Sequence, residues 1–240
     1  MKDNSYAKVN ESPKASQDFL IRKAKASDLD AIGDICLKTG FYGRDASHLF
    51  SQPEMIGRYC ALPYYSFDRD FCLVLEKNRE VAGYCIGTPS SNSFFEWMES
   101  SWLPELRIQY PKDSATKSLQ EQQILDAIHS NAIPEPEPWH KDYPAHLHIN
   151  LLPSAQGSGW GKKLICSMWQ LLAAAGAAGV FLSIWKQNAG ADGFYRAIGF
   201  QELGETETGR LFCKDLKDYN PSLVSSISWA ICLAVIFPSK

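Results

Sequence analysis

The stretch Gln156-Gly-Ser-Gly-Trp-Gly161-Lys-Lys-Leu decides the fold of this chain, because it joins a tight glycine loop to the start of a helix. An apolar run, residues 146–152, precedes it, and a helix-forming run, residues 164–175, follows it. The loop therefore leads from a strand to a helix N-terminus, where free backbone N–H groups and the helix dipole attract anions. Its glycines lack a Cβ that would keep a phosphate away. We expect the loop to bind a phosphate or pyrophosphate.

The spacing of the glycines excludes two common nucleotide-binding loops. A Walker loop requires Ser or Thr directly after its lysine, and this chain has Lys163 there. A Rossmann loop requires Gly-x-Gly-x-x-Gly and an acid about 20 residues later, whereas the spacing here is Gly-x-Gly-x-Gly and residues 176–179 contain no acid. The pattern Gln-x-x-Gly-x-Gly, with Pro153 before it, resembles motif A of the GCN5-related N-acetyltransferases (the GNAT superfamily). This resemblance implies that the loop holds the pyrophosphate of acetyl-CoA.

A second motif lies downstream of the first. A β-rich run, residues 180–185, is followed by Asn188-Ala-Gly-Ala-Asp-Gly-Phe-Tyr195-Arg-Ala-Ile-Gly199-Phe, which resembles motif B of the same family. Asn188 suits a helix N-cap, and Gly199 suits the left-handed residue that ends a helix. With two motifs in family order and at family spacing, the chain is identified as a member of the GNAT superfamily over about residues 19–214.

The resemblance implies an α/β fold, which some schemes classify as α+β. Its centre would be a mixed, mostly antiparallel twisted sheet flanked by helices, with a helical insertion between strands 3 and 4. It also implies acetyl-CoA as co-substrate, no metal, and direct acetyl transfer to an amine on a small molecule or a protein. The residues implied to bind acetyl-CoA are Leu151, Leu152, Gln156, Gly157, Ser158, Gly159, Trp160, Gly161, Lys162, Asn188 and Tyr195.

Two parts of that set have implied chemical roles. Backbone N–H groups near Leu151 and Leu152 would hold the thioester carbonyl and the pantetheine arm, because the family's strands splay there. Tyr195 would be catalytic, as the acid that protonates the departing thiolate.

The general base is harder to assign. His146 and His148 lie on the strand where family members often carry Glu or His, but they fall one position out of register with the His-x-His relay of serotonin-type acetyltransferases. A one-residue slip moves a side chain to the opposite face of a strand. We therefore expect His148 to be a packed imidazole or to act through another group. Asn150 shares its face and cannot accept a proton. In an active domain, water would carry the proton toward Asp142, His146 or His148.

A closer resemblance bears on whether the domain is active. The run Tyr143-Pro-Ala-His-Leu-His-Ile-Asn-Leu-Leu-Pro is similar to acetyltransferase-like domains related to the C-terminal domain of O-GlcNAcase, which also carry a long insertion before this strand. Some of those domains are pseudo-acetyltransferases, often with an acid where this chain has Asn150. The alternative function is therefore a non-catalytic CoA-binding or protein-binding module.

Composition limits the class of protein. The 240 residues are 45% hydrophobic and 21% charged, which suits one globular domain with an elaboration. A net charge of −3 and the lack of a basic tract argue against a nucleic-acid partner. The seven cysteines are odd in number and lack any Cys-x-x-Cys pair, which argues against disulfides and zinc sites. They favour a reducing compartment, the cytoplasm or the nucleus.

The chain divides into three parts. Residues 1–18 are polar and lack an apolar stretch, so we expect a disordered tail rather than a signal peptide. Residues 19–218 form the acetyltransferase domain. Residues 219–240 form a hydrophobic tail, in which positions 223–237 carry no charge. A membrane span usually needs about 20 apolar residues, with about 17 as the lower limit. We expect this segment to anchor the domain on the cytosolic side of a membrane, the alternative being a strand or helix packed on the domain.

The domain opens with a strand at 19–23, helices at 28–38 and 53–61, and strands at 71–76 and 81–88. Proline-punctuated helices at 94–102 and 118–129 lie in the insertion, at about 89–142. The insertion concentrates large rings, which we expect to form a hydrophobic cluster that covers a sheet edge, with one or two rings in the wall of the acceptor pocket. These rings are Phe94, Phe95, Trp97, Trp102 and Trp139.

Overall fold

The computed structural model describes residues 19–133, 137–217 and 219. The disordered tail expected at 1–18 and the membrane anchor expected at 223–237 lie outside these residues, and both stay predictions. Within the described ranges, no helix is both long and apolar enough to span a bilayer.

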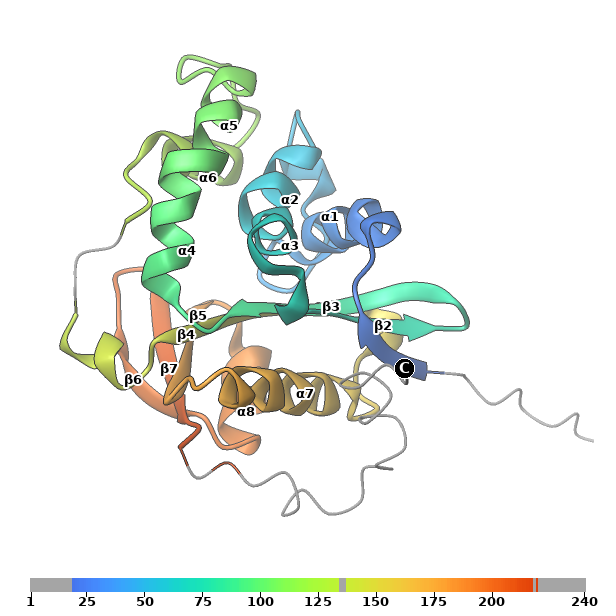
Figure 1. The fold of residues 1–240 in the computed structure, drawn as a ribbon. Coiled ribbons are helices and arrows are strands. Elements are labelled where there is room, and N and C mark those ends of the chain that lie inside the picture. Colours follow the sequence, from blue (N-terminus) through green and yellow to red (C-terminus); the bar gives the residue numbers. More distant parts are fainter. Residues whose placement is uncertain (1–18, 134–136, 218, 220–240) are drawn as a thin grey trace, which may run out of the picture.

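A seven-stranded sheet forms the centre of the described part (Figure 1), in the order β1-β2-β3-β4-β5-β7-β6. Of its neighbouring pairs, β4 and β5 are parallel and the others are antiparallel. This is the mixed, mostly antiparallel sheet that the sequence predicts. The strands are β1 (Phe19–Lys23), β2 (Cys72–Lys77), β3 (Glu80–Thr88), β4 (Ala145–Leu151), β5 (Gly179–Trp185), β6 (Gln201–Glu205) and β7 (Gly209–Asp215).

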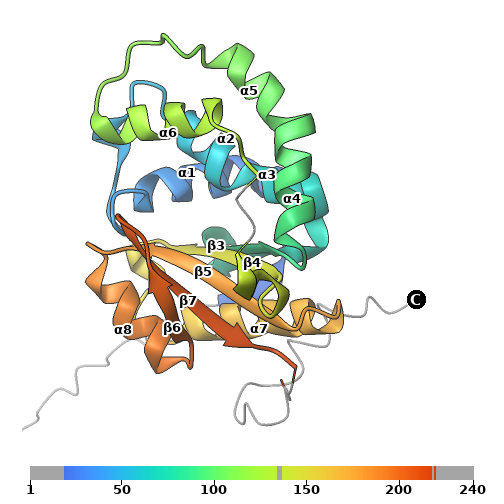
Figure 2. The same cartoon turned by 90° about the vertical axis from the view of Figure 1, so that its left-hand side faces the viewer.

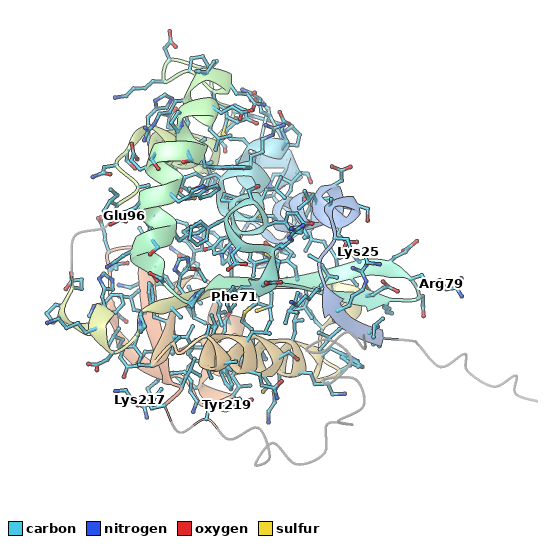
Figure 3. The ribbon with its side chains drawn as sticks, in the orientation of Figure 1. Lys25, Phe71, Arg79, Glu96, Lys217 and Tyr219 are labelled. Carbon is cyan, nitrogen blue, oxygen red and sulfur yellow. The ribbon has the colours of Figure 1, made fainter. Side chains whose placement is uncertain are left out.

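Helices cover both faces of the sheet (Figures 1 and 2). One face carries α1 (Leu29–Thr39), α2 (Glu54–Cys60), α3 (Leu62–Asp68) and the insertion, and the other carries α7 (Trp160–Ala174) and α8 (Ala189–Ala197). Because side chains alternate along a strand, β4 sends Ala145 and Leu147 into the core under α7, and its polar residues to the other face. Side chains fill the space between the sheet and the helices on each of its two faces (Figure 3).

The second predicted helix is confirmed, and a helix that was not predicted follows it directly. The helix expected at 53–61 ends at Cys60, and α3 begins two residues later at Leu62. Pro63 stands in the first turn of α3, where the N–H that proline lacks would have had no partner within the helix. The break at Ala61 is therefore compatible with both helices, and α3 was not predicted from the sequence.

The insertion between β3 and β4 is helical, as predicted. It contains α4 (Ser91–Trp97), a π-helical turn (Met98–Trp102), α5 (Leu103–Gln109), α6 (Leu119–His129) and a short 3-10 helix (Pro138–Lys141). Phe94 is buried in the cluster between the insertion and α1–α3. Trp102 packs on the same cluster, and its Nε1 donates to the Arg58 carbonyl at 2.9 Å. These rings therefore cover a face of the sheet rather than an edge.

His146 belongs to this buried layer. Its Nδ1 lies 2.8 Å from the Ser91 hydroxyl, and its Nε2 lies 2.7 Å from the Tyr64 hydroxyl. The ring also stacks on Phe95 at a centroid distance of 5.2 Å. Burial lowers the pKa of His146 to about 3, so its imidazole is neutral at physiological pH. The expectation that a proton from the reaction could pass to His146 is wrong, because both ring nitrogens are already bonded inside the core.

We expect His146 to make the fold sensitive to acid. Its pKa is about 3 in the folded protein and about 6.5 in an unfolded chain. The unfolded state therefore binds more protons than the folded state. The contribution of His146 to the free energy of unfolding is complete above about pH 6.5 and decreases as the pH falls toward 3. At pH 5 the free energy of unfolding should be about 2 kcal/mol lower than at pH 7 through this group.

Urea unfolding at pH 7 and pH 5 tests this, with His146→Gln as the comparison. The amide can still bond Ser91 and Tyr64 but does not titrate, so the variant should lose about 2 kcal/mol less than the wild type between the two pH values. The same pH dependence in both proteins would contradict the assignment.

Candidate functional site

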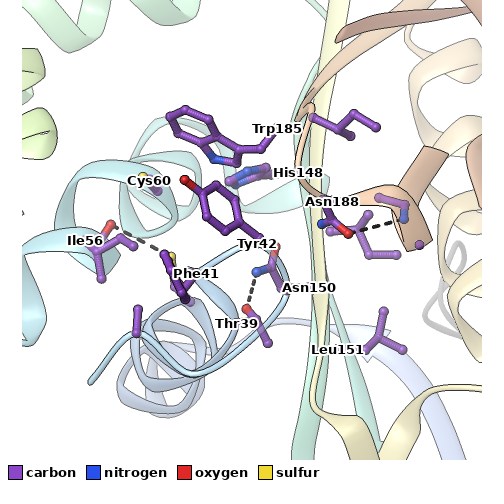
Figure 4. Close-up of a pocket in the computed structure, with 18 of the residues that line it drawn as sticks. Thr39, Phe41, Tyr42, Ile56, Cys60, His148, Asn150, Leu151, Trp185 and Asn188 are labelled. Carbon is purple, nitrogen blue, oxygen red and sulfur yellow. Dashed lines mark hydrogen bonds between the residues drawn. The ribbon is translucent and has the colours of Figure 1, made fainter. Parts of the chain in front are cut away.

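A cavity of about 690 Å³ lies where β4 and β5 separate (Figure 4). The two strands pair only at Ala145 with Val180 and at His146 with Phe181. Beyond these pairs the strands diverge, and the space between them continues into the cavity. Its lining comes from α1, α2 and the segment between them, from α6, from both strands, from the glycine loop and from α8.

The backbone of β4 faces this gap at alternate residues. The Leu152 N–H donates to the Ala82 carbonyl on β3 at 2.9 Å. Since successive residues of a strand direct their N–H groups to opposite sides, the Leu151 N–H is directed toward the gap. Leu151 lines the cavity, as predicted. Leu152 does not line it, and its N–H cannot hold a thioester carbonyl because the sheet already uses it.

The glycine loop has the geometry of an anion site. Gly157 and Gly159 have φ values of +75° and +79°, and a Cβ added to either would meet no atom of the protein within 4 Å. Gly159 is the N-cap of α7 and provides no side-chain cap, so the N–H groups of the first turn remain for a ligand. That turn contains Lys162 and Lys163 and no acid. The loop therefore suits an anionic group such as a phosphate.

Most of the residues predicted to bind acetyl-CoA come together at this cavity. Those that line it are Leu151, Gln156, Gly157, Gly159, Gly161, Asn188 and Tyr195. Ser158, Trp160 and Lys162 belong to the same loop and first helical turn but do not line the cavity. Trp160 instead stacks on Phe19 at a centroid distance of 5.0 Å.

Motif B positions two of these residues. Asn188 caps α8 as predicted, because its side chain accepts from the Ala191 N–H at 3.3 Å. Tyr195, on the same helix, is 7% exposed. Burial raises the pKa of Tyr195 well above its usual value. The phenol therefore stays protonated at physiological pH, as a proton donor requires.

Asn150 presents a fixed hydrogen-bond acceptor to the cavity. The Thr39 hydroxyl donates to the Ile35 carbonyl at 2.7 Å, so it can only accept from the Asn150 Nδ2 group that contacts it. This contact assigns the NH₂ group of Asn150 to Thr39 and leaves its Oδ1 for a ligand. Both residues line the cavity (Figure 4).

His148 lines the cavity as well, on the same face of β4 as Asn150 (Figure 4). Burial lowers the pKa of His148, and a hydrogen bond with the backbone of Cys60 opposes this effect in part. The imidazole is therefore neutral and able to accept a proton. Among the described residues that line the cavity there is no Asp or Glu. The expectation that His148 is packed or acts through another group stays a prediction, and the structure adds that His148 forms part of the cavity wall.

One other expectation about the cavity is not met, because none of the five rings of the insertion lines it. The insertion instead contributes Gln120, Gln123 and Ile124 of α6. The water-mediated proton path toward Asp142 stays a prediction: the Asp142 side chain lies outside the cavity, is 67% exposed and is 3.7 Å from Lys217 Nζ.

Comparison with known proteins places this geometry in a family context. A family model described as FR47-like protein matches residues 139–210. The chain is 25% identical to the Protein O-GlcNAcase of Rattus norvegicus and to that of Mus musculus over 158 residues. The match covers 65% of this chain and 17% of those proteins, so the chain spans about a sixth of their length.

Solved structures match over most of the chain. The crystal structure of SsHAT is 29% identical with a TM-score of 0.76, over 82% of this chain and 98% of that one. The crystal structure of PH1933 from Pyrococcus horikoshii OT3 is 14% identical with a TM-score of 0.54, over 82% of this chain and 98% of that one. The crystal structure of an N-acetyltransferase from Staphylococcus aureus Mu50 is 15% identical with a TM-score of 0.50, over 83% of this chain and 99% of that one. The chain thus has the fold of the GNAT superfamily, and its sequence is similar to FR47-like proteins and to part of O-GlcNAcase.

Proposed function

We propose that this protein is an acetyl-CoA-dependent N-acetyltransferase that transfers an acetyl group directly to an amine. The GNAT fold supports acetyl transfer in general. The observation that carries the proposal is that a single cavity contains an anion-binding loop, a neutral imidazole and a protonated phenol. These are the groups that binding of a CoA thioester and movement of two protons require.

Each group has a role in this proposal. The glycine loop and the first turn of α7 bind the pyrophosphate, and the Leu151 N–H bonds the pantetheine arm or the thioester carbonyl. Acetyl-CoA, when bound, supplies the activated acetyl group. Asn150 Oδ1 accepts a hydrogen bond from the amine, and His148 takes up the proton that the nitrogen loses as the amide forms. Tyr195 gives its proton to the CoA sulfur and regains one from solvent.

The alternative is a module that binds CoA or a protein without catalysis. It is favoured by the similarity to part of O-GlcNAcase and by the absence of a carboxylate among the described residues of the cavity wall. The two functions differ in turnover, and calorimetry with acetyl-CoA followed by a thiol-release assay on a panel of primary amines separates them. Binding with release indicates the transferase, and binding without release for any amine indicates the module. A chain that does not bind acetyl-CoA would rule out both the transferase and a CoA-binding module.

Tyr195→Phe tests the proposed acid. We expect the dissociation constant of acetyl-CoA to change less than twofold and kcat to fall by about 10²-fold, because the hydroxyl acts on the leaving group in the transition state. Tyr110→Phe is the matched control, since it removes a buried hydroxyl in the insertion, away from the cavity. An equal loss of acetyl-CoA affinity and turnover in Tyr195→Phe would make Tyr195 a binding residue instead.

A further inference from the structure

The cavity is lined without charged side chains. Among the described residues that line it, none is Asp, Glu, Lys or Arg. The polar groups on the acceptor side are amides, hydroxyls, thiols and the imidazole of His148. A second ammonium or a carboxylate on the acceptor would therefore lose its hydration without gaining a counter-charge. This wall suits an acceptor whose only ionisable group is the reacting amine.

Tyr42 is held over the cavity by a two-residue hairpin. Phe41 and Arg44 exchange two backbone hydrogen bonds, each of 2.9 Å, and the residues between them, Tyr42 and Gly43, have φ values of +54° and +84°. Two successive positive φ values define a type I′ turn, which prefers Asn or Asp followed by Gly. Tyrosine is unfavourable at the first of these positions, because its Cβ is strained there. Turn formation therefore does not explain this residue.

Trp185 stands opposite, at the end of β5. It is 41% exposed, although it is a large apolar side chain. Its ring lies edge-on to the ring of Tyr42, at a centroid distance of 5.9 Å and an interplanar angle of 79°. Both residues line the cavity, beside His148 (Figure 4). The two rings form an open aromatic corner at the cavity wall, defined here as Tyr42 and Trp185.

We propose that the acceptor is a small arylalkylamine, a primary amine on a short carbon chain that carries an aromatic ring and no second charge. Its ring packs in the aromatic corner, since aromatic pairs prefer edge-on or offset contacts. Its nitrogen reaches Asn150 Oδ1 and His148, and the uncharged wall favours the neutral amine that attacks the thioester. This substrate class rests on the proposed function for its turnover, but its binding can be measured separately.

The test is a calorimetric titration of the full chain, saturated with CoA, with four amines. These are 2-phenylethylamine, hexylamine (apolar without a ring), spermidine (with further charges) and a lysine-containing peptide with a blocked N-terminus. We expect 2-phenylethylamine to bind at least tenfold more tightly than each of the others. In the thiol-release assay with acetyl-CoA, kcat/KM should follow the same order.

Two variants of Tyr42 make the test specific. Tyr42→Asn places a preferred residue in the type I′ turn, so its melting temperature should be equal to or above that of the wild type. It should weaken 2-phenylethylamine binding about tenfold and leave the affinity for acetyl-CoA unchanged. Tyr42→Phe keeps the ring and should bind the amine as the wild type does.

The outcomes separate the substrate class from the reaction. Tighter binding of spermidine or the peptide, no binding of 2-phenylethylamine, or equal binding by Tyr42→Asn would each overturn the arylalkylamine proposal, even if some amine is acetylated. Binding of 2-phenylethylamine that depends on Tyr42, without thiol release, would uphold the site and overturn the transferase.

Discussion

Gly159→Val should abolish acetyl-CoA binding, with the dissociation constant rising at least 100-fold. The wild-type loop leaves open space where a Cβ would project, and the helix N–H groups beside it have no side-chain cap. A valine side chain would fill the approach to these donors. A hydrogen bond to a charged group contributes about 1.5–3 kcal/mol, so the loss of two such bonds accounts for at least a 100-fold change, at 1.4 kcal/mol per factor of ten.

Backbone strain must be separated from this effect, because Gly159 has a positive φ. Gly176 is the matched control: its φ is +84°, a Cβ there also meets nothing within 4 Å, and it lies just beyond the opposite end of α7. Both Gly159→Val and Gly176→Val should lose about 1–2 kcal/mol of stability. In calorimetry, Gly176→Val should bind acetyl-CoA with the affinity of the wild type, whereas Gly159→Val should not bind it.

A smaller ligand refines the test. Acetyl-pantetheine lacks the pyrophosphate, so Gly159→Val should bind it as the wild type does. Equal losses for both ligands would mean that the valine distorts the whole cavity, and unchanged acetyl-CoA affinity would mean that the phosphates bind elsewhere.

The local structures around the site that the sequence predicted correctly depend on local backbone chemistry. The glycine loop and the Asn188 cap of α8 are each set by a few consecutive residues, whose conformational preferences are the same in any fold. Leu152 shows the limit of this reasoning. Which of two successive N–H groups faces the gap depends on pairing with Ala82 of β3, and the sequence of β4 does not contain that information.

The acceptor side of the cavity was less predictable because it is assembled from distant segments. Strand alternation correctly put His148 and Asn150 on one face, but only the packing of α1 and α2 shows that this face borders a cavity. Tyr42 and Trp185 were not predicted. A Tyr-Gly pair inside a short turn was a usable signal for the first, whereas the exposure of Trp185 is visible only in the folded chain. Likewise, α6 reaches the cavity and the aromatic rings of the insertion do not.

His148→Gln should lower kcat by about 10²–10³-fold while the affinity for acetyl-CoA stays the same, because a general base contributes 10²–10⁴-fold. Burial lowers the pKa of His148, so the neutral, proton-accepting form persists to a pH below the usual 6.5. At saturating amine, log kcat of the wild type should therefore be flat near pH 7 and decrease with unit slope only at lower pH, where the imidazole becomes protonated. The variant should lack this acidic limb, since glutamine does not titrate.

The control and the rescue make this result specific to a proton-transfer role. His140→Gln removes an imidazole that does not line the cavity, so it should keep the wild-type kcat and pH profile. Added imidazole should restore part of the activity of His148→Ala, because a free base can occupy the space that the side chain leaves. If His148→Gln kept the acidic limb at a reduced kcat, His148 would position the acceptor rather than take its proton. If it kept the wild-type kcat, the proton would leave by another route, and the neutral imidazole in the cavity wall would no longer support the proposed mechanism.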